Sequence, residues 1–301
     1  MRQCIDGVLL LDKPLTMSSN RALQIAKRIY NAEKAGHTGT LDPLASGLLP
    51  VCFGEATKYA SLMLEANKGY RAVLKLGQTT TTGDAEGEVV ETRQVAVDNL
   101  LVEQVLAKFR GTIRQKPPMH SALKHKGKPL YAYARKGIEI ERPERAVTIH
   151  ELSMDDLSGE ALTLFVLCSK GTYVRVLAED IGKALGCGAH LKSLVRTATG
   201  PFDLADAHGL EEIEAREDRE SLLLPCDVLL QGIARMDFGE EDADFLVNGR
   251  KVEIDALPGF YRAYDASGCF IGLVEADEEG QIRPRRMMSG NYCLRNSPVK
   301  R

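Results

Sequence analysis

The apolar positions near the start of the chain predict a strand over residues 7–11 and then an amphipathic helix. The apolar residues of that helix recur at helical spacing: Ala22, Ile25, Ala26 and Ile29. Ser18 or Ser19 precedes them and is a suitable N-cap, because a serine hydroxyl can accept a bond from a free backbone N–H. The chain is therefore expected to open with a buried strand followed by a helix that packs through one face.

Further segments carry one of these two periods. Strands are predicted at 70–76 and 161–168, and helices at 57–66, 97–109, 130–136, 173–185 and around 210–223. From about residue 233 the pattern changes to short strands separated by turns, at 259–264, 269–275 and 281–288. We therefore expect a separate small β domain at the C-terminal end.

Composition excludes several classes of protein. The 301 residues are 44% hydrophobic and 27% charged, which is ordinary for a globular chain and excludes disorder, collagen or a coiled coil as a description of the whole. No apolar run approaches the roughly 18 residues of a membrane span, and residues 1–7 hold no signal-peptide core. We expect a cytoplasmic protein without membrane contact. The seven cysteines include no Cys-x-x-Cys pair and are expected to be buried thiols.

The net charge of −3 hides an uneven distribution. Residues 110–145 carry ten lysines or arginines against three glutamates, a net charge of +7, whereas residues 203–244 carry a net charge of −11. Four prolines and three glycines in the basic segment indicate an extended excursion from the core. One surface could attract phosphates, although two ordinary solvated faces would give the same counts.

Familiar cofactor motifs are absent from the sequence. It contains no phosphate-binding loop, no dinucleotide fingerprint, no zinc-protease His-Glu-x-x-His and no nucleophile elbow. Among the remaining candidates, Asp42 lies in Gly39-Thr40-Leu41-Asp42-Pro43 and follows a glycine-rich stretch that contains His37. The pattern alone favours Asp42 as a helix N-cap, but such loops also let a backbone approach a ligand.

A set of collinear blocks resembles the TruB family of tRNA pseudouridine synthases. The resemblance covers nearly all of residues 7–235 and is carried by Asp12-Lys13-Pro14, by the segments 36–47, 52–58 and 77–84, by Tyr70-Arg71, Ser121-Ala122-Leu123-Lys124 and Leu130-Tyr131, and by Gly171-Thr172-Tyr173-Val174-Arg175 and Gly188-Ala189-His190-Leu191. It implies an α+β pseudouridine synthase fold, with a mixed, largely antiparallel sheet flanked by helices. The implied domains are 1–233, catalytic, with a basic insertion at about 110–145, and 234–301, an RNA-binding PUA-like β domain.

The resemblance also implies the reaction. Uridine at position 55, in the T loop of tRNA, is flipped out and isomerised to pseudouridine without a cofactor or a metal, since the bond from C1′ to N1 is exchanged for one to C5. Asp42 is the implied essential carboxylate, whether it attacks C1′, adds to the base or forms a glycal. It must be ionised, and Arg175 is the implied cation that keeps it so in a dry slot. Tyr70 is implied to stack on the uracil and to help remove the C5 proton.

Other roles follow from the same resemblance. His37 would assist base flipping, Tyr173 and Leu194 would line the uracil pocket, and Lys13 and Pro14 would support the active-site loop. The basic excursion would close over the tRNA arm and meet phosphates through Lys124, Lys126, Lys128, Arg135 and Lys136. Two residues depart from the family pattern, His120, where an aromatic residue is common, and Val195, where arginine is frequent.

Two other classes of function remain open at this point. A non-catalytic tRNA chaperone would need the basic excursion and the β domain, but not Asp42, Tyr70 and Arg175 together. A hydrolase of glycosidic bonds would need a second carboxylic acid as proton donor, and none is evident. We expect the T arm of tRNA as the ligand and no protein partner, and nothing in the sequence demands more than a monomer.

Overall fold

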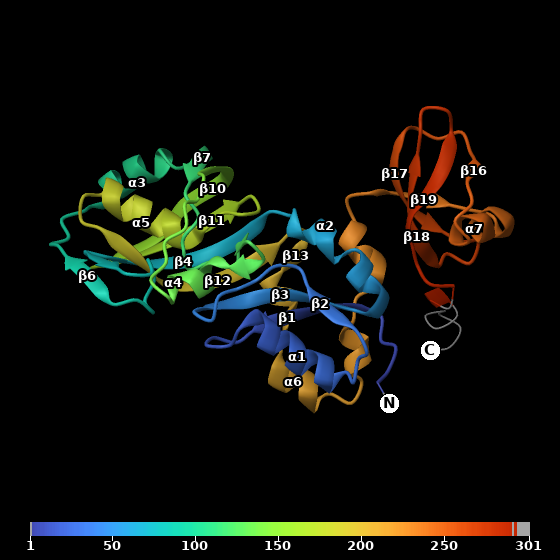
Figure 1. Ribbon diagram of the computed structural model, residues 1–301, viewed down its shortest axis with the longest axis horizontal. Coiled ribbons are helices and arrows are strands. Elements are labelled where there is room, and N and C mark those ends of the chain that lie inside the picture. The colour runs from blue at the N-terminus through green and yellow to red at the C-terminus, as the bar shows by residue number, and fades with distance from the viewer. Residues whose placement is uncertain (1, 291, 294–301) are drawn as a thin grey trace.

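The computed structural model describes residues 2–290 and 292–293; residues 294–301, the end of the predicted C-terminal domain, lie outside this description together with residues 1 and 291. The molecule is elongated, with a large mixed sheet at one end and a small β domain at the other (Figure 1). No helix of the described residues combines the length and the apolar character that crossing a bilayer would require.

The central sheet contains ten strands, and its main path runs β14-β1-β3-β12-β4-β11-β10-β7. Only the β1–β14 and β3–β12 pairs are parallel, so the sheet is mixed and largely antiparallel, as predicted. Its strands are β1 (Gly7–Lys13), β2 (Ala35–His37), β3 (Ala45–Phe53), β4 (Lys68–Leu76), β7 (Gly111–Gln115), β10 (Arg145–Ser158), β11 (Ala161–Cys168), β12 (Ala189–Thr199), β13 (Phe202–Asp203) and β14 (His208–Gly209).

Three hydrophobic clusters hold helices against this sheet. One packs α3 and α5 on β4, β10, β11 and β12, and a second packs α1 and α6 on β1 and β3. The third joins the other face of β1 and β3 to the C-terminal domain, through Tyr59, Phe270 and Tyr292 among others. The helices are α1 (Ser19–Ile29), η1 (Gly54–Lys58), α2 (Ala60–Leu64), α3 (Asn99–Ala107), α4 (Leu130–Ala134), α5 (Val174–Ala184), η2 (Leu204–Asp206), α6 (Leu210–Ala215), η3 (Arg219–Leu222) and η4 (Cys226–Leu230).

The first predicted elements are confirmed in detail. Ser18 is the N-cap of α1, and its hydroxyl accepts a hydrogen bond from the backbone N–H of Arg21 at 3.2 Å. Ala22, Leu23 and Ala26 are buried on one face of the helix, against β1 and β3. The periodicity of this segment therefore identifies the helix and part of the face that packs, since the predicted Ile25 and Ile29 are only half-buried.

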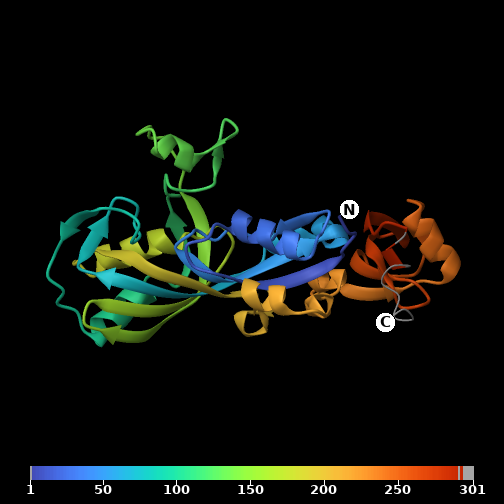
Figure 2. The ribbon, with the colours of Figure 1, turned by 90° about the horizontal axis from the view of Figure 1, so that it is seen from below.

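The basic excursion leaves the sheet between β7 and β10. Its own elements are small, a two-stranded ribbon of β8 (Lys124–His125) and β9 (Lys128–Pro129) followed by α4. It stands out from the sheet as a separate projection (Figure 2). Residues 111–115 and the segment from 145 onward pair with each other in the sheet, so the projection itself comprises residues 116–144.

The C-terminal domain is a curled five-stranded sheet of order β15-β17-β18-β19-β16. Its elements are β15 (Ala234–Asp237), α7 (Glu240–Val247), β16 (Val252–Glu253), β17 (Gly259–Tyr264), β18 (Phe270–Ala276) and β19 (Gln281–Met287). The three longest strands lie where the sequence predicts them. A further two-stranded ribbon, β5 (Gln78–Thr80) with β6 (Val89–Thr92), extends from the end of β4.

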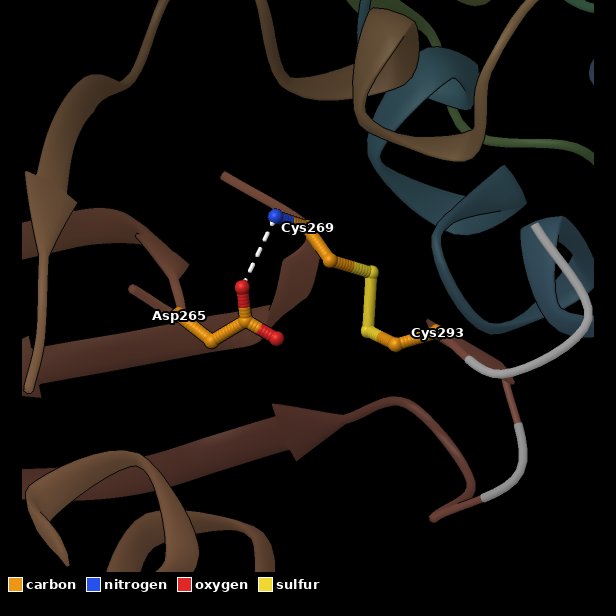
Figure 3. Close-up of side chains that lie close together, drawn as sticks. All are labelled: Asp265, Cys269 and Cys293. Carbon is orange, nitrogen blue, oxygen red and sulfur yellow. Dashed lines mark hydrogen bonds between the residues drawn. A yellow bond between two sulfur atoms is a disulfide. The ribbon is translucent and has the colours of Figure 1, made fainter. Parts of the chain in front are cut away.

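The expectation that all seven cysteines are buried thiols is wrong for three of them. Cys4 is exposed, and Cys269 and Cys293 form a disulfide. The fold brings the last two together because Cys269 precedes β18 and Cys293 follows β19, its neighbour in the sheet. The Asp265 carboxylate accepts a hydrogen bond from the Cys269 backbone N–H at 2.9 Å (Figure 3). The other four cysteines are buried and free, as expected.

Candidate active site

A cavity of about 280 Å³ lies beside the middle of the central sheet. This volume is at the small end of the range for ligand sites and suits a single base better than a large cofactor. It is bounded by the loop between β2 and β3, by β4, by the start of α5, by β12 and by the root of the basic excursion. Residues predicted for the site that line it are Asp42, Tyr70, Tyr173, Arg175 and Leu194.

Arg175 joins two carboxylates at this cavity. Its Nη2 lies 2.5 Å from Asp42 Oδ2, and its Nη1 lies 3.0 Å from Asp84 Oδ2. Arg175 and Asp84 are both buried, with 7% and 3% of their surfaces exposed. The alternative of a surface arginine is therefore wrong, and the ion pair predicted for Arg175 and Asp42 is present.

Asp42 itself is more exposed than expected. Its side chain retains 56% of its accessible surface, so the expectation of a dry slot is wrong for the free protein. The physical reason is that the loop presents the carboxylate at the cavity mouth, where a ligand must enter. The helix-cap alternative is also wrong, because residues 43 and 44 form a turn that leads into β3, with the Ala45 N–H donating to the Asp42 carbonyl at 3.0 Å.

The Asp42 loop is fixed by the first helix. The Ser19 hydroxyl, buried at the start of α1, accepts a bond from the Leu41 N–H at 2.7 Å and donates to the Leu41 carbonyl at 2.9 Å. Lys13 is fully buried and donates to the carbonyls of Pro14 and Met17, at 2.9 and 2.6 Å. The Ser19 bonds hold the Asp42 loop, and the Lys13 bonds hold the turn after β1 that contacts this loop.

Two β-bulges aim the side chains of β12 at the cavity. In the pairing of β12 with β4, the register shifts after Leu191 and again after Arg196. Residues three apart on a regular strand face opposite sides, whereas the first bulge lets Leu191 and Leu194 both line the cavity. Arg196 lies directly opposite Tyr70 in this register and lines the cavity with it.

Burial acts strongly on the ionisable groups around the cavity. It raises the pKa of the Tyr70 phenol, an effect that the charge of Arg196 and a hydrogen bond from its guanidinium oppose. Desolvation lowers the pKa of Lys13 to about 8 and that of Lys68 to about 8, and Arg196 adds to both shifts. The site therefore contains buried cations near Asp42 that are costly to keep charged.

The other predicted residues lie around the cavity and do not line it. His37 is half-buried on β2, where its Nδ1 accepts a bond from the Gly39 N–H at 3.3 Å, and burial lowers its pKa, so that the imidazole is neutral at pH 7. Pro14 is exposed in the turn after β1. The five predicted phosphate contacts are all exposed on the basic excursion: Lys124, Lys126, Lys128, Arg135 and Lys136.

The two residues that depart from the family pattern have different positions. His120, at the root of the excursion, lines the cavity, so this departure falls on the cavity wall. Val195 is half-buried on β12 between two cavity residues, opposite Arg71.

Pattern reasoning missed three charged residues of the site. Asp84, Lys68 and Arg196 are 3%, 8% and 1% exposed, whereas charged residues are expected at the surface unless something identifies a partner. Asp84 is the last residue of segment 77–84, one of the blocks that resemble the TruB family. That resemblance was the one feature of the sequence that could have identified it. Nothing in the periodicity distinguishes Lys68 or Arg196 from surface residues.

Comparisons with known proteins agree along the length of the chain. The model of the TruB family pseudouridylate synthase N-terminal domain matches residues 27–174, and that of the tRNA pseudouridylate synthase B C-terminal domain matches residues 175–231. A third, pseudouridine synthase II TruB, C-terminal, matches residues 235–288. The chain is 53% identical to the tRNA pseudouridine synthase B of Thiobacillus denitrificans, over 96% of this chain and 97% of that one. It is 50% identical to that of Chromobacterium violaceum, over 96% of both chains.

Solved structures show the same fold at low sequence identity. A chain of a Cbf5–Nop10–Gar1 complex superposes with a TM-score of 0.71 at 24% identity, covering 95% of this chain and 84% of that chain. A chain of an H/ACA RNP bound to a substrate RNA containing 2′-deoxyuridine gives a TM-score of 0.70 at 22% identity, with 94% and 84% covered. With three family domains matched in order and relatives about half identical over nearly their whole length, the chain belongs to the TruB family of pseudouridylate synthases.

Proposed function

We propose that this protein converts uridine to pseudouridine in tRNA, that its target is uridine 55 of the T loop, and that Asp42 carries the reaction. The observation that supports this most directly is the Asp42–Arg175 ion pair at the mouth of a base-sized cavity whose wall contains Tyr70. A carboxylate can act as a nucleophile or a base, and the guanidinium beside it fixes its position at the cavity mouth.

The reaction needs a base that has left its stack. Flipping costs roughly a few kcal/mol, and the cavity offers compensation through the Tyr70 ring and the apolar side chains of Leu191 and Leu194. The flipped ribose would then lie beside Asp42, at the exposed mouth. Closing RNA over this mouth would supply the dry surroundings that the free protein lacks.

The isomerisation requires no outside oxidant or energy source. The C1′–N1 bond breaks, the uracil turns while it is still held in the cavity, and C1′ is joined to C5. The C5 proton then leaves while N1 takes up a proton, so that atoms and electrons balance. In our proposal Asp42 acts at the sugar and the Tyr70 phenolate takes the C5 proton.

The remaining predicted residues receive supporting roles. His37, as a neutral imidazole at the edge of the loop, would assist flipping, and Lys13 and Pro14 would hold the turn beside the loop. The exposed cations of the basic excursion would bind tRNA phosphates, and residues 234–301 would form the second RNA-binding domain, after a catalytic domain of residues 1–233. We propose that the protein acts as a monomer in the cytoplasm, without a protein partner.

The competing functions fit the site less well. A hydrolase would need a second acid within reach of the glycosidic bond, but Asp84 is buried against Arg175 and does not line the cavity. A binding protein would have no use for an aspartate, an arginine and a tyrosine that converge on one small cavity.

The assignment to position 55 can be tested with two tRNA transcripts. One is unmodified, and the other differs only by cytidine in place of uridine 55. After incubation with the protein, pseudouridine is located by carbodiimide labelling and primer extension. We expect one new stop, at position 55, in the first transcript and none in the second. Modification elsewhere would overturn the site, and no modification at all would overturn the activity.

A further inference from the structure

Arg196 is a deeply buried cation of the central sheet, with 1% of its surface exposed. Within the described part of the chain it forms no ion pair with a carboxylate. Its guanidinium instead donates to two backbone carbonyls, from Nε to Leu48 at 2.6 Å and from Nη2 to Gly39 at 3.2 Å, and its charge acts on the Tyr70 phenol. A buried arginine without a carboxylate is costly, so its position calls for a functional explanation.

The geometry of the sheet directs Arg196 at Tyr70. The two residues are opposite each other in the β12–β4 pair, and opposite residues on antiparallel strands place their side chains on the same face. The second bulge of β12 follows Arg196 immediately, and both side chains line the cavity. Bulges next to active sites commonly re-aim a side chain in this way.

The positive charge of Arg196 acts on the phenol oxygen of Tyr70, the atom that would take up the C5 proton. A guanidinium keeps its proton in proteins, so it is a permanent cation beside the phenol. Burial is the largest influence on Tyr70 and raises the pKa of its phenol, and the charge of Arg196 opposes that rise and so makes the phenolate less costly to form. Arg175 does not serve this purpose, because its two terminal nitrogens are bonded to Asp42 and Asp84.

We propose that Arg196 is a positioning residue for Tyr70, which holds the phenol oxygen toward the cavity and stabilises its phenolate for removal of the C5 proton. This inference rests on the proposed function. In the step concerned, the C5–H bond breaks and its proton passes to the phenolate oxygen. The electron pair of that bond forms the C5–C6 double bond, and the pair of the N1–C6 double bond moves to N1, which is then protonated.

The buried lysines cannot take this role. Lys68 directs its ammonium group at the backbone carbonyls of Leu64 and Ala66, at 3.1 and 2.6 Å. Lys13 is bonded to carbonyls of the turn that follows β1. Both contribute charge to the site, but their hydrogen bonds point away from Tyr70.

The test compares two RNA substrates that differ at C5. One T-arm stem-loop carries uridine and the other carries 5-fluorouridine, which has no C5 proton to remove after the new bond to C1′ has formed. Single-turnover rates of glycosidic rearrangement are measured on both RNAs by nucleoside analysis, with the native protein and with Arg196→Lys. Lysine keeps the charge but loses the fork of donors that reaches the Leu48 and Gly39 carbonyls at once and so fixes the charge beside Tyr70.

We expect the ratio of the uridine rate to the 5-fluorouridine rate to fall at least about tenfold in Arg196→Lys, with its uridine pH profile displaced to higher pH. The matched control is Ser19→Ala, which loosens the Asp42 loop without touching Tyr70 and should slow both RNAs while leaving the ratio unchanged. An unchanged ratio in Arg196→Lys would overturn the inference. A native protein that rearranges neither RNA would instead overturn the proposed function.

A second measurement covers the case in which Arg196→Lys does not fold. The chain has no tryptophan, so the ultraviolet absorbance of tyrosinate can be followed directly. Difference titrations of the native protein against Tyr70→Phe and against Tyr59→Phe isolate the ionisation of two buried phenols. Tyr59 is the reference, because the hydrogen bonds of its hydroxyl within the described residues go only to a carbonyl and a thioether sulfur. We expect Tyr70 to ionise at a lower pH than Tyr59. Ionisation of Tyr70 at the same pH or above would contradict the inference.

Discussion

Replacing Asp84 by asparagine tests the shared use of Arg175 by two carboxylates. Asp84 is 3% exposed and its Oδ2 lies 3.0 Å from Arg175 Nη1. The substitution leaves a buried guanidinium with a neutral partner on that side. It also removes the charge that draws Arg175 away from Asp42, so the guanidinium can shift toward the Asp42 carboxylate.

The magnitude follows from burial. Breaking a buried ion pair by removing one partner costs about 3–5 kcal/mol, and the lower end applies because the amide oxygen can still accept a hydrogen bond. For a chain of this size, a loss of about 3 kcal/mol lowers the melting temperature by roughly 5 °C. A displacement of about 1 Å at the reacting groups lowers the rate about 10²-fold, so we expect that loss in the chemical step.

The assay is thermal unfolding together with single-turnover release of tritium from C5 of uridine, at saturating protein. The matched control is Glu179→Gln. Glu179 lies near Arg175 and Asp84, and burial raises its pKa, but it forms no ion pair with Arg175 among the described residues. Its neutralisation should change the rate less than about threefold. A native rate and a native melting temperature in Asp84→Asn would refute the argument that Arg175 is balanced between two carboxylates.

The remaining predictions concern stability and RNA binding. Gly182→Ala would place a Cβ 2.1 Å from the backbone nitrogen of Ala189 and should destabilise the protein by about 3 kcal/mol in urea unfolding; native stability would mean that α5 packs differently on β12. Folding lowers the pKa of Lys68 from the reference value of 10.5 to about 8, so below pH 8 the folded protein must hold a charged lysine that its burial disfavours. The unfolding free energy of the native protein relative to Lys68→Met should therefore be constant below pH 8 and rise by up to about 3 kcal/mol toward pH 10.5; a fall over this range would contradict the shift. Lys126→Ala with Lys128→Ala should weaken tRNA binding and reduce the slope of log affinity against log salt by about 2, at a nearly unchanged rate once tRNA is saturating; a native slope would place the excursion away from the RNA.

Periodicity predicts elements well where one face is buried and the other exposed. Helix α1, with its Ser18 cap, and strands β17, β18 and β19 show this. Strand β10 was not predicted, because much of its 14 residues is polar and two register shifts interrupt its alternation. Helix α7 was missed because its first turn is acidic and its apolar residues are gathered in its second half, which leaves no helical period to read. Central strand β12 is absent from the predicted strands, since its two bulges break the period of two.

The site depended on a different kind of information. Asp42, Tyr70, Tyr173, Arg175 and Leu194 were gathered by resemblance to a family, and the fold brings all five to one cavity. Their separation along the chain hides this from any local pattern. Buried cations such as Arg196 cannot be predicted from the sequence pattern, because the carbonyls that hold them become neighbours only in the folded sheet.

The role of Asp42 is tested most directly by the fate of the hydrogen at C5. T-arm RNA with tritium at C5 of uridine is incubated with the native protein and with Asp42→Asn, and both proteins are checked for RNA binding. The native protein should release the tritium to solvent, and Asp42→Asn should release none above background while it binds the RNA with about native affinity. Continued release by Asp42→Asn would contradict the account, because the chemistry would then proceed without this carboxylate.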